Sequence, residues 1–209
     1  MPSLRLALRV VTLSLLAMSS AAPAWAGGGP LGIDTQVAYD NGGIWKRSKQ
    51  NFLVNGLIGG VLLGALAEGG EDRLGRTFWQ GVDAGILSGA AEIGLKYVFG
   101  RERPSQTNDP NRWFTHGQSF PSGEVTTVSS LVTPFVLEYG RDHPAVYALE
   151  LLPAYDAIAR VKTRGHWQSD VIAGFALGTG TAYLLRRRTT PFFLSLMPRG
   201  VQVGVIKRF

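Results

Sequence analysis

The sequence FWQGVDAGILSGAAEIGLKYVFGRERP, residues 78–104 of this 209-residue chain, joins a long apolar segment to a charged cluster that ends in proline. The apolar part, residues 78–99, is far longer than a typical β-strand of about 5–6 residues. This length predicts an α-helix. Pro104 disfavours helical geometry at the residue before it, so we expect the helix to end near Arg103.

Segments of the same character lie on both sides of this one. Turn-forming residues separate them, including Gly69-Gly70 and Pro121-Ser122-Gly123. We therefore expect an all-α fold, a helical bundle of about five or six helices. The other predicted helices cover residues 51–67, 125–139, 145–160 and 171–185, and a short β-hairpin is possible in the C-terminal tail around residues 198–200.

The first 26 residues differ from the rest of the chain. Arg5 and Arg9 accompany an apolar run, and Ala24-Trp25-Ala26 precedes a glycine-rich stretch. This pattern predicts a signal peptide over residues 1–26, and an uncleaved membrane anchor is the alternative. We expect an exported protein, in the periplasm or at a membrane surface of the cell envelope. The remaining chain divides into a linker or N-terminal segment (27–50), a helical domain (51–188) and a tail (189–209).

Composition excludes several classes of function. The chain has no cysteine, which excludes disulfides, zinc–thiolate sites, iron–sulfur clusters and a cysteine nucleophile. Its net charge of +6 comes without basic runs interleaved with aromatic residues, so we expect no nucleic-acid partner. Charged residues inside the predicted helices favour a bundle packed on itself, in water or on a membrane surface, over a membrane-spanning one. Integral membrane association remains an alternative.

Two short stretches place cations and backbone N–H groups where an anion could bind. Lys96 and Arg103 lie seven residues apart, about two helical turns, and can share one face of a helix. Ser122 and Gly123 precede an apolar helical run, and a helix N-terminus of this kind offers free N–H groups to an anion. Each pattern also has a purely structural explanation, as cations at a helix C-terminus and as an ordinary helix cap.

A third stretch supplies a candidate nucleophile. His166 and Asp170 lie four residues apart, so they can meet on one helical face. A carboxylate that binds one imidazole nitrogen leaves the other free to attack or to accept a proton. Arg160 lies six residues upstream, across a turn that contains Gly165. The alternative is a structural His–Asp pair.

In this order, the three stretches resemble the three-part signature of the type 2 phosphatidic acid phosphatase superfamily, which includes bacterial acid phosphatases, lipid phosphate phosphatases and vanadium haloperoxidases. Its first part, Lys, six residues, Arg-Pro, is matched by Lys96 to Pro104. Its third part, Ser-Arg, five residues, His, three residues, Asp, is matched at Arg160, His166 and Asp170. Pro-Ser-Gly-His, the second part, is matched at residues 121–123. The resemblance covers about residues 50–188 and implies a helical-bundle fold, which is the fold of the family.

The resemblance implies hydrolysis of a phosphomonoester or diphosphate through a phosphohistidine, without a metal or other cofactor. His166 would be the nucleophile and Asp170 its orienting partner. The substrate would be a phosphorylated lipid or a small phosphoester. The phosphate would be held by Lys96, Arg103, Ser122, Gly123 and Arg160.

Two positions depart from the signature. Ala159 stands where the family usually has Ser, a phosphate contact of modest value. Glu124 stands where the family has the His that is thought to protonate the leaving group. Glu124 could act as the acid, the leaving group could need no proton, or the chain could bind phosphate without turnover. His116, in the loop before the motif, is a possible substitute acid, although a solvated loop residue is the simpler interpretation. The rival hypothesis is thus a phosphate-binding pseudoenzyme or a structural protein of the envelope.

Overall fold

The structure, a computed structural model, describes residues 27–188. The predicted signal peptide and the predicted tail hairpin lie outside these residues. Five α-helices and two short 3-10 helices occur between residues 27 and 188, and this range contains no β-strand. The predicted all-α bundle is therefore confirmed. The α-helices are α2 (Arg47–Glu68), α3 (Arg73–Phe99), α4 (Gly123–Tyr139), α5 (Leu151–Lys162) and α6 (Gln168–Leu185).

Every α-helix begins at a different residue from the one expected, and three of the starts differ by four or more residues. Helix α3 begins at Arg73 rather than at residue 78. The helix predicted from residue 145 begins as the 3-10 helix η2 (Pro144–Glu150), with Pro144 in its first turn, and becomes α-helical at Leu151. Helix α2 begins at Arg47, inside the segment expected to be a linker, and a second 3-10 helix, η1 (Gly43–Trp45), comes just before it. The segment expected to be a linker is therefore part of the folded domain, to which it contributes the start of α2 and the buried Asp34.

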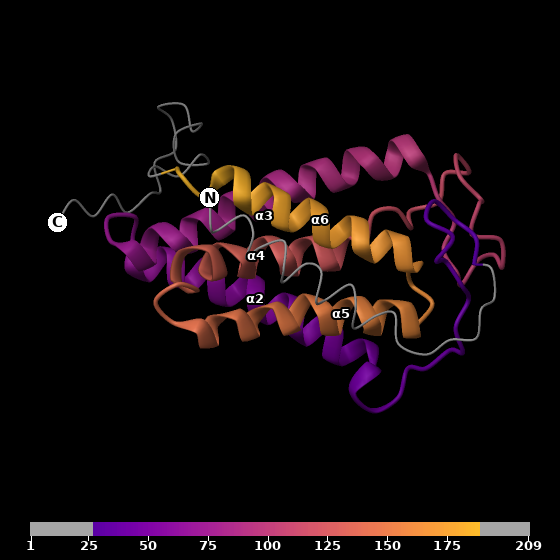
Figure 1. Cartoon of the computed structure of the whole chain (residues 1–209), viewed down its shortest axis with the longest axis horizontal. Coiled ribbons are helices and arrows are strands. Elements are labelled where there is room, and N and C mark those ends of the chain that lie inside the picture. The colour runs from indigo at the N-terminus through magenta and orange to yellow at the C-terminus, as the bar shows by residue number, and fades with distance from the viewer. Residues whose placement is uncertain (1–26, 189–209) are drawn as a thin grey trace.

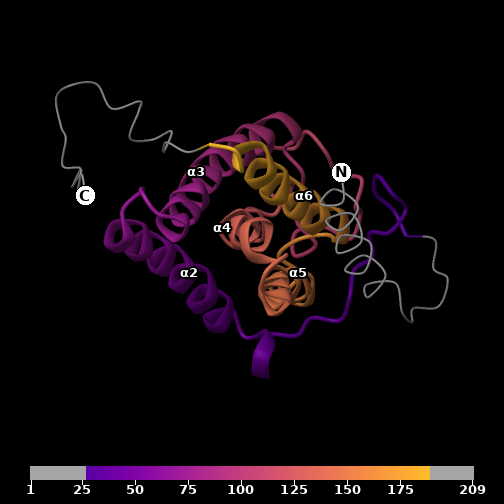
Figure 2. The ribbon, with the colours of Figure 1, turned by 60° about the vertical axis from the view of Figure 1, so that its left-hand side comes forward.

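Helix α4 is the centre of the bundle. It contacts α2, α3, α5 and α6, which surround it (Figure 2). Its sequence fits this place, because Val125 and Val128 are fully buried and Leu131 and Val132 nearly so. Two of its buried hydroxyl groups donate hydrogen bonds back to the backbone, Thr126 to the carbonyl of Ser122 and Ser130 to that of Thr127, and Thr133 donates to Glu150.

The closest packing is between α4 and α6. A Cβ atom at Gly178 would lie 2.4 Å from the carbonyl oxygen of Thr126 and 2.9 Å from the amide nitrogen of Ser130. At Gly174 it would lie 2.6 Å from the carbonyl oxygen of Ser122. Helix α6 can therefore come this close to the backbone of α4 only because Gly174 and Gly178 have no side chain.

Three connecting segments gather at one end of the bundle, whereas the short connections 69–72 and 140–143 lie at the other end (Figure 1). The three segments that gather together are residues 27–46, 100–122 and 163–167. At this end α3 finishes at Phe99, and the next residue, Gly100, has the left-handed conformation (φ 46°) that favours glycine. The chain leaves the helix there, so the expectation that Lys96 and Arg103 share one helical face is wrong. Arg103 lies in the loop that follows.

Helix α2 has a large apolar surface. Within residues 27–188 it is the helix that is long and apolar enough to cross a membrane by length and composition. Phe52, Leu63 and Leu66 are each more than 65% exposed on it. Helix α3 beside it also exposes large apolar side chains, among them Ile93 and Tyr97.

We predict that Gly178→Ala destabilises the fold by about 1–3 kcal/mol, because the new methyl group meets the backbone of α4. Gly180→Ala on the same helix is the matched control. Among the described atoms, none lies within 4 Å of a Cβ at Gly180, so the substitution should stabilise the protein by up to about 1 kcal/mol. Denaturant unfolding of both variants measures the difference. Equal effects at the two positions would contradict the close packing of α4 and α6.

Candidate functional site

A cleft of about 610 Å³ opens at the end of the bundle where the connecting segments gather. Its walls come from the starts of α2 and α4, the last turns of α3 and α5, and the loops between them. Positive side chains predominate in the lining, because five cations accompany two carboxylates. The cations are Arg47, Lys96, Arg103, Arg160 and Arg164, and the carboxylates are Glu92 and Glu124.

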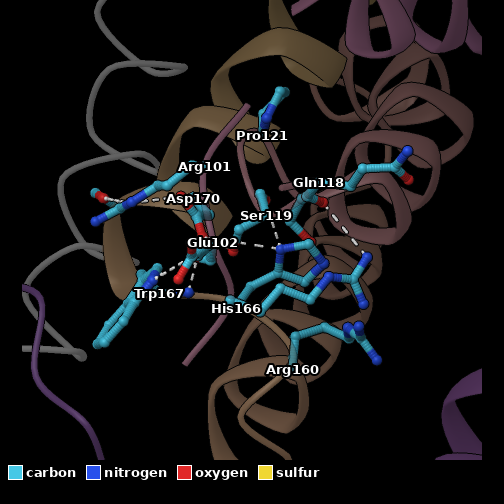
Figure 3. Close-up of polar contacts among 12 residues, drawn as sticks. Arg101, Glu102, Gln118, Ser119, Pro121, Arg160, His166, Trp167 and Asp170 are labelled. Atoms are coloured by element: carbon cyan, nitrogen blue, oxygen red, sulfur yellow. Dashed lines mark hydrogen bonds and ion pairs between the residues drawn. The ribbon is translucent and has the colours of Figure 1, made fainter. Parts of the chain in front are cut away.

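His166 lies in the wall of this cleft and is only 3% exposed. Its Nδ1 atom is 2.7 Å from the backbone carbonyl oxygen of Ser119 (Figure 3). A carbonyl oxygen can only accept, so Nδ1 carries the hydrogen and donates it. The Nε2 atom of a neutral ring then keeps its lone pair.

The surroundings of His166 favour this neutral ring. Burial lowers its pKa well below 6.5, and the positive charges of Arg160, Lys96 and Arg103 lower it further. The hydrogen bond to Ser119 acts in the opposite direction. A buried imidazole beside three cations is therefore unprotonated near neutral pH.

The expected hydrogen bond between Asp170 and His166 is replaced by an indirect connection. The nearest carboxylate oxygen of Asp170 is 3.9 Å from His166 Nδ1, too far for a hydrogen bond. Asp170 Oδ2 instead accepts hydrogen bonds from the Ser119 hydroxyl and from the backbone N–H of Trp167, the latter at 2.9 Å. Ser119 thus joins the two residues, through its hydroxyl on one side and its carbonyl on the other (Figure 3).

The other oxygen of Asp170 is bound by Arg101, a residue that the spacing argument did not single out. Arg101 is fully buried, and its Nη1 atom lies 2.6 Å from Asp170 Oδ1. Its Nη2 atom lies 2.6 Å from Asp34 Oδ2. Burial raises the pKa of Asp170, while the charge of Arg101 and the hydrogen bonds to Ser119 and Trp167 lower it.

Lys96 and Arg103 converge from different segments. Lys96 Nζ donates to the carbonyl oxygens of Gln118 at 2.7 Å and Pro121 at 2.8 Å, and it pairs with Glu92 at 3.0 Å. Arg103 Nη2 reaches the same Gln118 carbonyl at 3.4 Å. Burial lowers the pKa of Lys96, which Glu92 opposes. The loop before α4 therefore holds both cations at the cleft.

The two residues expected at the helix N-terminus have different positions. Gly123 lines the cleft, and a Cβ there would lie 2.6 Å from Glu92 Oε1, so glycine permits this approach. Ser122 is fully buried and is not among the residues that line the cleft. Its hydroxyl has no hydrogen-bond partner in the described part of the chain.

Arg160 lines the cleft together with His166. It is 5% exposed, and a Cβ at Gly165 would lie 2.4 Å from its Nη2 atom, so the guanidinium packs directly on that glycine. Burial lowers the pKa of Arg160, and the charge of Glu124 opposes this. Its Nε atom has no hydrogen-bond partner between residues 27 and 188.

Glu124 faces the cleft but is already engaged. Both of its carboxylate oxygens accept hydrogen bonds from Arg47, one of them at 2.5 Å. Arg160 Nη1 lies 3.8 Å from the same carboxylate. Both oxygens are thus occupied as acceptors in an ion pair, whereas a general acid has to direct a proton toward the leaving group.

The structure brings together at the cleft six of the eight site residues proposed from the sequence, and it places Ser122 and Asp170 behind the wall. The six are Lys96, Arg103, Gly123, Glu124, Arg160 and His166. His116 is exposed and is not among the lining residues. Arg47, Arg101 and Ser119 were missed, because no periodicity or spacing marks them. No cluster of three or more potential metal ligands occurs in residues 27–188.

Comparison with known proteins gives three relatives named lipid A 1-phosphatase. The protein from Porphyromonas gingivalis is 35% identical over 94 residues, which is 44% of this chain and 19% of the relative. Those from Rhizobium johnstonii and Rhizobium etli are each 34% identical over 100 residues, again 44% of this chain and 40% and 42% of the relatives. The chain therefore spans about a fifth to two fifths of the relatives' length. No solved structure matches it.

The family profile described as the PAP2 superfamily matches residues 82–193. This segment is more than half of the chain and contains Lys96, Arg103, Arg160, His166 and Asp170. The chain belongs to the PAP2 superfamily.

Proposed function

We propose that this protein is a phosphatase that acts on a phosphorylated lipid through a phosphohistidine at His166. The observation that carries the proposal is a neutral imidazole, its Nδ1 hydrogen donated to Ser119, in the wall of a cleft lined by cations. Phosphoryl transfer depends mainly on positioning and on stabilising spread negative charge. Lys96, Arg103 and Arg160 supply that stabilisation.

In this reaction the Nε2 lone pair of His166 attacks phosphorus and forms a P–N bond, while the P–O bond to the leaving group breaks. As the P–N bond forms, positive charge develops on the ring, and the Ser119 carbonyl that accepts the Nδ1 hydrogen stabilises it. Water then attacks phosphorus, the P–N bond breaks, and His166 returns to its neutral form with release of inorganic phosphate. No metal takes part in the proposed sequence.

The leaving group decides the part that Glu124 plays. An alcohol needs a proton as it leaves, whereas the phosphate that leaves from a diphosphate is already a stable anion. The pairing of Glu124 with Arg47 favours a leaving group that needs no proton from the protein. For a monoester, Glu124 serves as the acid only after the pair separates and it takes up a proton.

A lipid as substrate is supported by two observations. The relatives named above are lipid A 1-phosphatases. Helix α2 starts at the cleft with Arg47 and carries the exposed Phe52, Leu63 and Leu66. Its 22 residues extend roughly 33 Å at 1.5 Å per residue, close to the thickness of the hydrocarbon core of a bilayer. We propose that this face lies against the membrane that holds the substrate.

A second candidate is a phosphate-binding protein without turnover. The Arg47–Glu124 pair favours it, because the position that supplies a proton in the family holds an occupied carboxylate. The two candidates make opposite predictions for His166.

We predict that His166→Ala lowers phosphate release by more than about 10³-fold, because the nucleophile is lost. His143→Ala is the matched control, since this exposed histidine lies beyond the far end of α4. The measurement is release of inorganic phosphate from lipid monophosphates, lipid diphosphates and small phosphomonoesters. A wild-type protein that releases phosphate from none of them would contradict the proposed function.

The pH dependence follows from the lowered pKa of His166. The reactive neutral ring is present above the pKa, so we expect kcat/KM to show no loss from His166 protonation as the pH falls from 7.5 to 6.5. Nitrogen-15 NMR of the imidazole should show a neutral ring with its hydrogen on Nδ1 at pH 6.5. A ring that is mostly protonated at that pH would contradict this assignment.

We predict that Glu124→His raises kcat on a phosphomonoester by about 10²-fold, because a positioned histidine can protonate the leaving alcohol. The same change should have a much smaller effect on a lipid diphosphate. Assay of both substrates across pH 5–8 checks the difference. An equal gain on the two substrates would show that Glu124 limits the reaction in another way.

A further inference from the structure

Arg47 is the first residue of α2, which lies wholly before the segment matched by the family, residues 82–193. It nevertheless reaches the cleft, where it is 77 residues from Glu124 in the sequence. The two side chains form a two-pronged ion pair, with Nη1 and Nη2 each donating to one carboxylate oxygen. Helix α2 therefore supplies part of the site from outside the matched segment.

Arg47 is held in place through both its guanidinium and its backbone. Its Nη1 atom donates to Gln50 Oε1 at 2.7 Å, and Gln50 is fully buried. Gln50 Nε2 donates in turn to the carbonyl of Trp45 at 2.8 Å. The backbone N–H of Arg47 donates to Asn41 Oδ1 at 2.7 Å. Such a preorganised guanidinium loses little conformational entropy when it binds a carboxylate.

Glu124 has a second cation within reach. Its Oε1 atom is 3.8 Å from Arg160 Nη1, which also lies 3.4 Å from the Gln50 oxygen that Arg47 uses. Without Arg47, the carboxylate would keep Arg160 as its nearest partner. A carboxylate on Arg160 competes with a phosphate for the same guanidinium and repels it as well.

We propose that Arg47 is a positioning residue of the site, which keeps Glu124 off Arg160 so that a phosphate group can bind there. This inference rests on the proposed function in taking the bound anion to be the substrate's phosphate. Arg47 acts through Glu124, so its importance depends on the negative charge at that position. A helix outside the family segment thereby compensates for a carboxylate where the family has a histidine.

A double-mutant cycle tests this dependence. The variants are Arg47→Met, Glu124→Gln and the two combined, with the wild-type chain as reference. Calorimetry measures the dissociation constants of inorganic phosphate and orthovanadate, and kcat and KM are measured in parallel. Lys49→Met is the matched control, because this exposed lysine lies on the same turn of α2 and is not among the residues that line the cleft.

We expect Arg47→Met to weaken anion binding by about tenfold in the wild-type background, because the freed carboxylate then occupies Arg160. With Gln at position 124 the same change should cost less than about twofold. Lys49→Met should leave binding unchanged. With a phosphorylated substrate, Arg47→Met should raise KM and have a smaller effect on kcat.

Two results would overturn the proposal. Equal losses in the two backgrounds would mean that Arg47 binds the anion directly, and no loss in either would mean that Arg47 has no part in binding. If Arg47→Met does not fold, as judged by its thermal unfolding, the neutral and polar Arg47→Gln completes the cycle. A wild type that binds phosphate but hydrolyses no substrate would contradict the proposed function and leave this binding test decisive.

Discussion

The buried guanidinium of Arg101 between the carboxylates of Asp34 and Asp170 is the interaction on which the site end of this protein depends. It joins three segments that are far apart in sequence, namely the N-terminal segment, the loop after α3 and the start of α6. All three side chains are at most 2% exposed. Burying charges has a large desolvation cost, so such a cluster adds little net stability, but the loss of one member leaves the others uncompensated. Its main effect is therefore to fix one arrangement of these segments.

The position of the imidazole follows from that arrangement. Arg101 holds one oxygen of Asp170, the other oxygen holds the hydroxyl of Ser119, and the carbonyl of Ser119 holds His166. An acid four residues after a histidine on a continuous helix would face it directly. Here α6 begins at Gln168, so His166 precedes the helix and Asp170 lies in its first turn, where it accepts the backbone N–H of Trp167. The carboxylate of Asp170 therefore caps the start of α6, although it was expected to bind His166 directly.

This difference marks the boundary of what the sequence can predict. Segment length and turn residues were sufficient for the helices, because burial of long apolar stretches depends on local pattern. Motif spacing was sufficient to bring Lys96, Arg160 and His166 to one cleft. The partners of Glu124 and His166 could not be predicted, because they come from segments far apart in the sequence. Helical periodicity relates only residues within one helix. Arg47 reaches Glu124 only through the packing of α2, and Ser119 contributes a backbone carbonyl, which no side-chain pattern reveals.

Charge at the site end is balanced in more than one way. Glu124 is balanced by a guanidinium, whereas the fully buried Asp156 has no hydrogen-bond partner in the described chain. Burial and the charge of Glu124 raise the pKa of Asp156 to about 7, so a proton cancels its charge over the acidic range. The contacts between α4 and α6 are of a different kind. Glycines of α6 lie against the backbone of α4, and no charged group takes part. The packing of α6 on α4 therefore contributes stability that does not depend on attraction between the charged groups at the cleft, while the Arg101 cluster fixes the segments around them.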